Sequence, residues 1–249
     1  MSDFSIPVIT AITATFFVAG LVKGITGMGL PTVAMGVLGA LLSPLAAATL
    51  LIVPSFVTNA WQLFAGADFR AILGRLWPMM LAIVVGTMLG ASFIAGGDTV
   101  LTTATLGAAL ASYALYTLFA RQISVPGAAE RWMSPLVGVV TGLITGCTGV
   151  FVIPAVPYLQ ALGLSKDDLV QALGLSFTVS TVALAAGIGA QGAFQIERLA
   201  ISVIAVIPAL AGMWAGQVVR DRISPSTFRR GFLLFLFLLG VEMAIRPFL

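Results

Sequence analysis

The sequence predicts an all-α protein that crosses a membrane several times, and three features lead to this fold class. Hydrophobic residues make up 59% of the 249 residues and charged residues only 8%, whereas soluble domains carry about 25% charged residues. The apolar stretches continue for the roughly 20 residues that a membrane helix needs, without the alternation of barrel strands. The third feature is an internal duplication. We therefore expect a single membrane domain over residues 1–249.

Eight apolar segments follow one another along the chain. Two of them, 6–42 and 133–162, are interrupted by clusters of glycine and proline. The other six are continuous, and each is about as long as one membrane helix: 45–65, 76–95, 100–120, 169–190, 199–219 and 231–245. The expected order is therefore one broken, hairpin-like segment followed by three transmembrane helices, given twice.

The two interrupted segments carry one motif at matching places in the two halves. The first contains "VKGITGMGLP" at 22–31 and the second "GLITGCTGVFVIP" at 142–154. Ser43 and Ser165 share the same offset of 122 residues. Five identities in the motif also share it: Gly20, Leu21, Gly24, Thr26 and Gly27 fall on Gly142, Leu143, Gly146, Thr148 and Gly149. Such self-similarity indicates two repeats, at about 1–122 and 123–249.

The distribution of basic residues predicts that the two repeats are inverted. If each interrupted segment is a hairpin that enters and leaves on one face, nine of the 12 basic residues share a side, and only Arg198 and Arg246 lie opposite. If each interrupted segment crossed once, the split would be six against five. The hairpin arrangement gives the clear positive-inside bias, with both termini outside. The nine residues expected in the cytoplasm are Arg70, Arg75, Arg121, Arg131, Lys166, Arg220, Arg222, Arg229 and Arg230.

Each hairpin is expected to carry its glycine-rich tip into the membrane interior. Arms of about 14–18 residues would reach roughly 21–27 Å, short of the ~30 Å hydrocarbon core. Broken backbone at that depth persists only inside protein or beside a water-filled cavity. The half-helix after each break would present free N–H groups and a positive dipole end to an anion. The alternative is that pairs such as Gly20/Gly24 serve close helix packing.

Candidate substrate-binding residues lie at both tips. Lys23 is the one charge inside the first interrupted segment, and charges inside a membrane usually have a function. The alternative is a lysine that snorkels from a helix end. Thr26 and Thr148 are candidates to donate hydroxyl hydrogen bonds to a ligand, or else to their own helix carbonyls. The tip residues beside them complete the set: Gly27, Met28, Gly29, Gly149 and Val150.

The helices that follow the two interrupted segments carry stripes of polar side chains at helical spacing. Such a stripe lines a transport path or holds helices together, and both interpretations stay open. The candidates for the path are Asn59, Gln62, Ser176 and Ser180, with Ser55, Thr58, Gln171, Thr178 and Thr181 beside them. Trp61 and Phe177 are candidates to shape the cavity.

The remaining composition excludes several classes of protein. The chain has no histidine and one cysteine, Cys147, which excludes a disulfide framework, His/Cys zinc sites, haem ligation by histidine and a Ser-His-Asp triad. We expect no catalytic residue, no metal, no cofactor and no enzymatic activity. Basic residues cluster only near 220–230, so no nucleic-acid partner is expected. Glu242 is either a proton carrier or the i,i+4 partner of Arg246.

The duplicated GxxxGxTG motif, the prolines after its glycines and the short basic connector before the last helix resemble the TauE/SafE family of membrane transporters over essentially the whole chain. The resemblance implies export of a small anion such as sulfite, sulfoacetate or another organosulfonate across the bacterial inner membrane, by alternating access around the paired broken segments. A selective anion channel and a transporter of a small carboxylate stay open as alternatives. The expected partners are the anionic substrate and the lipid bilayer, and a homodimer stays open.

Overall fold

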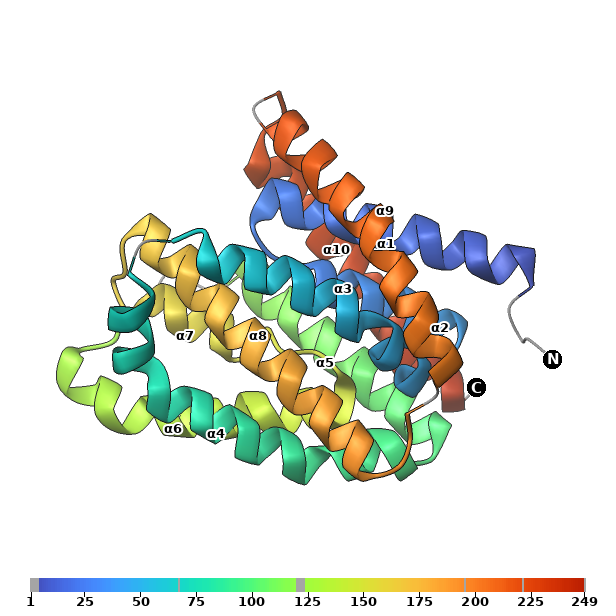
Figure 1. Cartoon of the computed structure of the whole chain (residues 1–249), viewed down its shortest axis with the longest axis horizontal. Helices are drawn as coiled ribbons and strands as arrows, with labels where there is room; N and C mark the ends of the chain where they lie inside the picture. Colours follow the sequence, from blue (N-terminus) through green and yellow to red (C-terminus); the bar gives the residue numbers. More distant parts are fainter. Residues whose placement is uncertain (1–4, 67, 120–123, 195, 221, 249) are drawn as a thin grey trace.

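The computed structural model describes residues 5–66, 68–119, 124–194, 196–220 and 222–248, and within these ranges it contains helices and no strands (Figure 1). The first half forms α1 (Ile6–Thr26), α2 (Leu30–Leu41), α3 (Pro44–Phe64), α4 (Phe69–Gly96) and α5 (Thr99–Phe119). The second half forms α6 (Gly127–Thr148), α7 (Ala155–Ala161), α8 (Lys166–Ala190), α9 (Ile196–Arg220), α10 (Pro225–Ile245) and the 3₁₀ turn η1 (Arg246–Phe248). The predicted all-α fold class is confirmed.

Seven helices in the described part of the chain are long and apolar enough to cross a membrane, namely α1, α3, α4, α5, α8, α9 and α10. Three helices begin six or seven residues before the predicted apolar segments: α4 at residue 69 instead of 76, α6 at 127 instead of 133, and α10 at 225 instead of 231. Their first two turns carry arginine side chains. These turns keep their backbone hydrogen bonds although they lack the apolar character by which the segments were recognised.

Both interrupted segments are hairpins whose arms return to the same end of the molecule. In the first, Leu41 at the end of α2 and Leu42 just after it line one cavity with Pro7 and Val8 of α1. In the second, the backbone N–H of Val125, just before α6, donates to the carbonyl of Ala161 at the end of α7, at 2.9 Å. The start of the outgoing arm therefore lies beside the end of the returning arm in both cases.

The outgoing arms are longer than predicted. α1 has 21 residues and α6 has 22, which corresponds to about 31–33 Å at 1.5 Å per residue. The returning arms are much shorter, 12 residues in α2 and 7 in α7. The prediction of 14–18 residues per arm was wrong because the first two glycines of each motif continue the helix.

These first two glycines serve helix packing. A Cβ on Gly20 would stand 2.1 Å from a backbone oxygen of α9, and one on Gly142 would stand 2.3 Å from a backbone oxygen of α4. The absence of a side chain thus lets the backbones approach closely, as in membrane helix dimers. The packing alternative is correct for Gly20, Gly24, Gly142 and Gly146. Gly20 packs against Ala209 and Met213 of α9 and Gly24 against Gly216 of α9, while Gly142 and Gly146 meet Gly86 and Gly90 of α4.

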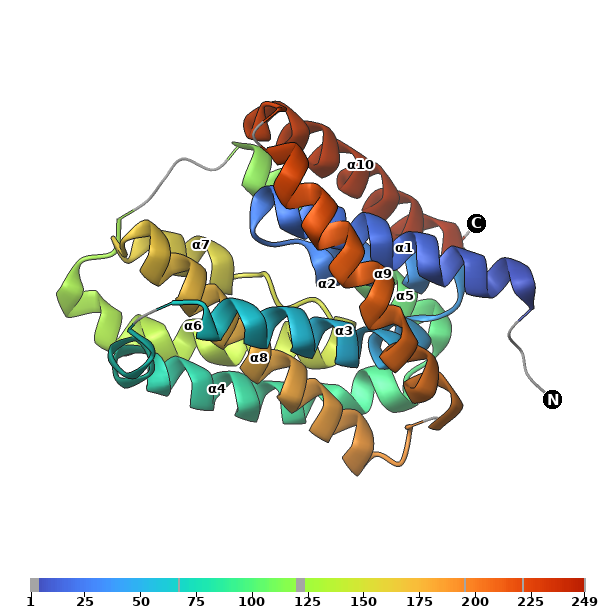
Figure 2. The same ribbon diagram turned by 45° about the horizontal axis from the view of Figure 1, so that its top comes forward.

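The equivalent helices α3 and α8 lie side by side and run in opposite directions (Figure 2). Ser55 contacts Thr181 near the middle of both helices. Further along α3, the Gln62 side chain donates to the carbonyl of Val170, near the start of α8. Both helices begin with a serine cap at the 122-residue offset, since Ser43 accepts from the N–H of Ala46 and Ser165 from that of Asp168.

The basic residues gather at one end of the molecule. This "basic end" comprises the end of α3, the start of α4, the base of the second hairpin and the connection from α9 to α10 (Figure 1, left and top). Both described chain ends lie at the opposite end, together with Arg198 and Arg246. Arg121 lies outside the described residues. The residues at the basic end are Arg70, Arg75, Arg131, Lys166, Arg220, Arg222, Arg229 and Arg230.

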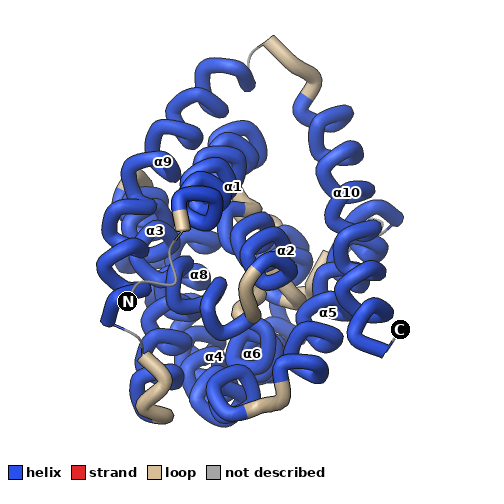
Figure 3. The backbone as a smooth tube through the Cα atoms, turned by 90° about the vertical axis from the view of Figure 1, so that its right-hand side faces the viewer, coloured by secondary structure: helices blue, strands red, loops and turns tan. Residues whose placement is uncertain are grey.

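The short helix α2 lies inside the bundle, near its middle when the molecule is viewed from the end that holds both chain ends (Figure 3). All residues from Gly29 to Gly36 are buried. The first hairpin therefore places its break and its returning helix among the longer helices, where broken backbone is shielded from lipid.

Candidate functional site

Lys23 is buried at the junction of α1 and α3. It lies in the last turn of α1 and is only 4% exposed. Its ammonium group donates to the hydroxyl of Thr58 at 3.2 Å and to the side-chain oxygen of Asn59. Both partners are fully buried and belong to α3. The sequence predicted Lys23 and Asn59 as candidates separately, and the structure brings them into direct contact.

The contact continues as a line of polar groups into the second half. The Asn59 amide donates to the hydroxyl of Ser55 at 2.9 Å, and Ser55 contacts the hydroxyl of Thr181 in α8 at 3.2 Å. These residues, Lys23, Ser55, Thr58, Asn59 and Thr181, are called the lysine cluster below. The cluster links α1, α3 and α8, so it connects the first hairpin to both of the antiparallel helices.

The lysine cluster contains a cation and no carboxylate. The ion pairs in the described part of the chain are Arg75–Glu130 and Arg246–Glu242, and neither involves Lys23. An ammonium group has three donors, and its described hydrogen bonds use two of them. Burying a charge beside neutral partners alone is unfavourable. A bound anion would supply a counter-charge to the Lys23 ammonium group and would accept a hydrogen bond from its third N–H.

The first break lies one turn beyond Lys23. Gly27 and Gly29 have φ angles of 80° and 103°, which residues with a side chain rarely adopt. The Thr26 hydroxyl donates to the carbonyls of Val22 and Met28, at 2.9 and 2.6 Å. α2 then begins at once at Leu30. A Cβ on Gly27 would meet nothing within 4 Å, so open space adjoins this break.

The second break has the same threonine–glycine turn but a different continuation. The Thr148 hydroxyl donates to the carbonyl of Ile144 at 2.6 Å and accepts from the N–H of Val150 at 3.2 Å, and Gly149 has a φ angle of 71°. The next helix, α7, begins only at residue 155 and has 7 residues. The expectation that a half-helix directly follows each break is therefore wrong for the second hairpin.

The residues between the second break and α7 explain this difference. β-Branched and aromatic side chains favour extended backbone, and the residue before a proline avoids the helical region. The first break is followed by a proline within the first helical turn, where proline is tolerated. After the second break, the apolar side chains of residues 150–152 are fully buried, and Phe151 packs against Phe177 with ring centroids 5.4 Å apart.

The candidate residues of the two polar stripes have different surroundings. The Gln62 side-chain N–H donates to the carbonyl of Val170 in α8. The Gln62 side-chain oxygen is buried and has no hydrogen-bond partner among the described residues. The hydroxyls of Ser176 and Ser180 are also buried and have no hydrogen-bond partner among the described residues. Such groups are unfavourable unless a ligand or water pairs with them. Thr26 and Thr148 have the predicted alternative contact, a bond to their own helix carbonyl, and their role in binding stays a prediction.

Three other residues from the sequence lie apart from the lysine cluster. Trp61 is 70% exposed, so it does not shape an internal cavity. Glu242 pairs with Arg246 at 3.5 Å, and both side chains are largely exposed. This is the i,i+4 pair that was predicted as the alternative to a proton carrier. The Cys147 thiol lies 3.7 Å from the carbonyl of Gly90, at the contact of α6 with α4.

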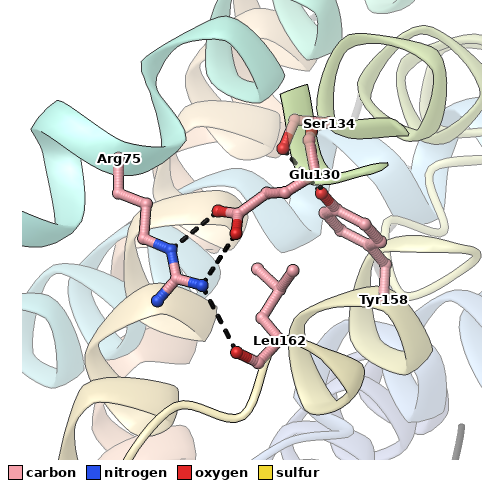
Figure 4. Close-up of polar contacts among 5 residues, drawn as sticks. All are labelled: Arg75, Glu130, Ser134, Tyr158 and Leu162. Carbon is pink, nitrogen blue, oxygen red and sulfur yellow. Dashed lines mark hydrogen bonds and ion pairs between the residues drawn. The ribbon is translucent and has the colours of Figure 1, made fainter. Parts of the chain in front are cut away.

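One polar network was not predicted from the sequence (Figure 4). Arg75 of α4 makes two hydrogen bonds to the Glu130 carboxylate of α6, at 2.7 and 2.8 Å, and a third to the carbonyl of Leu162 at 3.3 Å. The hydroxyls of Ser134 and Tyr158 lie 2.6 Å apart. Together these contacts close the base of the second hairpin at the basic end. Nothing in the sequence pairs Arg75 with Glu130, which are 55 residues apart.

Comparison with known proteins adds one finding. The family model described as "Sulfite exporter TauE/SafE" matches residues 12–243, nearly the whole chain. No curated protein matches the chain, and no solved structure does.

Proposed function

The chain belongs to the TauE/SafE sulfite exporter family, and from this premise we propose that it exports sulfite, sulfoacetate or another organosulfonate. The family supports export of a small anion in general, and the seven long apolar helices support a multi-pass membrane protein. We further propose that the membrane is the inner membrane of a bacterium. The basic end then lies in the cytoplasm, because positively charged loops are retained there.

The buried lysine is the observation that carries this proposal. Lys23 is 4% exposed and bonded to neutral side chains. A cation of this kind inside a membrane is expected to pair with a charged ligand. One oxygen of a sulfonate or of sulfite would accept a charge-assisted hydrogen bond from the free ammonium N–H. Another would accept a hydrogen bond from a nearby hydroxyl. A small carboxylate offers the same kind of acceptor and stays a second candidate.

We propose that the binding residues surround the lysine cluster and the two breaks. Lys23 supplies the charge, and Asn59 orients it. The open space beside Gly27 would admit the ligand. The other proposed contributors are Thr26, Met28 and Gly29 at the first break, Gln62, Ser176 and Ser180 on the stripes, and Thr148, Gly149 and Val150 at the second break. No residue in this set is assigned a catalytic role.

We propose that the two repeats, about 1–122 and 123–249, form one transport domain and move the anion by alternating access. Two observations support inversion of the repeats. The equivalent helices α3 and α8 run antiparallel, and the arms of each hairpin return to one end. Inverted repeats with broken helices around a central site are the common plan of secondary transporters.

Counterflow into liposomes tests the proposal. Purified protein would be reconstituted into vesicles loaded with unlabelled sulfite, and the uptake of labelled sulfite measured over time. A transporter predicts uptake that saturates with sulfite and is accelerated by sulfite on the opposite side. Uptake that is linear with concentration and indifferent to the internal anion would favour the channel alternative. Absence of flux for sulfite, sulfonates and carboxylates would contradict anion transport.

A further inference from the structure

We propose that the site selects anions with one negative charge over anions with two. This inference rests on the proposed function, because it concerns the ligand of the same site. It follows from the single cation that the described residues bring to the interior and from the neutral side chains that the second repeat offers in its place.

The first step is a count of buried charges. Lys23 is the one charged side chain among the buried residues of the described ranges. The other described basic residues lie at the basic end, or at the opposite end in the case of Arg198 and Arg246. The repeat equivalent of Lys23 is Thr145, which is buried and donates to the carbonyl of Thr141 at 2.7 Å. The interior formed by the described residues therefore offers a ligand one positive charge.

The second step concerns the groups that the second repeat offers in place of a cation. By the 122-residue offset, Thr58 and Asn59 correspond to Ser180 and Thr181. The offset holds here because the capping serines of α3 and α8 share it. The hydroxyls of Ser176 and Ser180 are buried without partners. They can donate hydrogen bonds to the oxygens of a ligand, but they cannot neutralise a second charge.

The third step is the consequence for a ligand. A singly charged anion neutralises Lys23, whereas a doubly charged anion leaves one negative charge without a partner in a poorly hydrated site. A charge left uncompensated inside a membrane is strongly unfavourable. We therefore expect a monovalent sulfonate to bind about tenfold or more tightly than a divalent one of similar size. Sulfite would bind as the hydrogen sulfite ion, and sulfoacetate less well than singly charged sulfonates.

Two probes of similar size test this selectivity on the purified full chain. 2-Hydroxyethanesulfonate carries one charge and 1,2-ethanedisulfonate carries two, and sulfonates remain ionised throughout the neutral range. Isothermal titration should give the lower Kd for 2-hydroxyethanesulfonate, by about tenfold or more. Equal or tighter binding of the disulfonate would overturn the inference while leaving anion binding intact. Failure of both probes and of sulfite to bind would instead contradict the proposed function.

The variant Thr145→Lys tests the cause of the selectivity. It places a second ammonium at the repeat equivalent of Lys23, so the preference for the monovalent probe should shrink about tenfold or reverse. Thr145→Val is the matched control, because it alters the same position without adding charge, and it should keep the parent ratio. An unchanged ratio in folded Thr145→Lys would contradict the charge count. If this variant does not fold, the ratio measured on the parent protein decides alone.

Discussion

The two hairpins share a turn and the glycine packing that precedes it, but they differ in what lies beside and after the turn. Each outgoing helix ends in a threonine that bonds back to its own helix, followed by a glycine with positive φ. The first hairpin adds the buried Lys23, a returning helix of 12 residues and open space beside Gly27. The second adds buried Val150 and Phe151. The duplication thus preserved the break, while the buried cation among the described residues lies in the first hairpin.

The bases of the hairpins differ as well. A cavity of about 210 Å³ lies between the arms of the first, lined by Pro7, Val8, Leu41 and Leu42 among others. The base of the second is closed by Arg75 and its partners at the basic end. The second hairpin is therefore fastened to α4, and the first is not fastened by an equivalent ion pair among the described residues. We therefore propose different roles for the two hairpins, with the charge for binding in the first and the anchoring contacts in the second.

The largest expected effect concerns the side from which each hairpin enters. In a Cys147→Ser background, single cysteines at Arg70 and Arg222 should be labelled only from the cytoplasm by an impermeant maleimide. A cysteine at Gln191, which is also exposed, should be labelled only from outside. The response is all or none for each position. If positions 70 and 191 reacted from the same face, the hairpins would not enter from opposite sides and the comparison would fail.

The glycines should separate into two classes by their effect on folding. Gly24→Leu pushes a side chain into the backbone of α9, since even its Cβ would lie 2.2 Å from a carbonyl oxygen. We expect this variant to be lost as folded protein, because overpacking of this kind destabilises strongly. Gly27→Leu meets open space and carries only backbone strain of about 1–2 kcal/mol, so it should remain in the membrane but lose transport.

Size-exclusion profiles in detergent and transport in vesicles measure the two effects. Gly149→Leu should also abolish transport, with some loss of folded protein, because a Cβ there would stand 2.8 Å from the side chain of Met35. A normal profile for Gly24→Leu would remove the packing role of that glycine. Full transport in both Gly27→Leu and Gly149→Leu would return the breaks to a purely structural role.

The smallest expected effect concerns the anchored base. Arg75 and Glu130 form a partly exposed bidentate pair, with side chains 41% and 17% exposed, and such pairs contribute about 0.2–1 kcal/mol. A double-mutant cycle with Arg75→Gln and Glu130→Gln should give a coupling in this range from thermal unfolding in detergent. The matched pair Arg246–Glu242 is longer, 3.5 Å, and more exposed, so its coupling should be smaller. Equal coupling in the two pairs would argue against an anchored second hairpin.

Local features of the fold could be predicted from the sequence. Long apolar segments identify membrane helices without knowledge of their partners, and the repeated glycine–threonine motif places both breaks. The roles of individual glycines could not be separated in this way. Gly24 and Gly27 are three residues apart, and only the approach of α9 makes one a packing residue and the other a break.

The site could be predicted only in part for the same reason. Lys23 and Asn59 were candidates because polar groups are rare in apolar helices. Their contact depends on how α1 is rotated against α3, which no spacing within one helix determines. The exposure of Trp61 and the Arg75–Glu130 pair likewise depend on tertiary placement. The β-branched residues after Gly149 favour extended backbone. The match to the first repeat nevertheless led to the prediction of a helix directly after this glycine.

Anion affinity of Lys23→Gln tests the central claim most directly, namely the proposal that Lys23 of the first hairpin supplies the positive charge of the binding site. The change removes the charge and one contact to the ligand, and loss of a hydrogen bond to a charged group costs roughly 1.5–3 kcal/mol. We predict a rise in Kd on the order of tenfold to a hundredfold for sulfite and sulfonates. The control Lys166→Gln removes the other lysine, which is exposed at the basic end, and should leave Kd unchanged. Parent affinity of folded Lys23→Gln for every anion that the parent binds would contradict the claim.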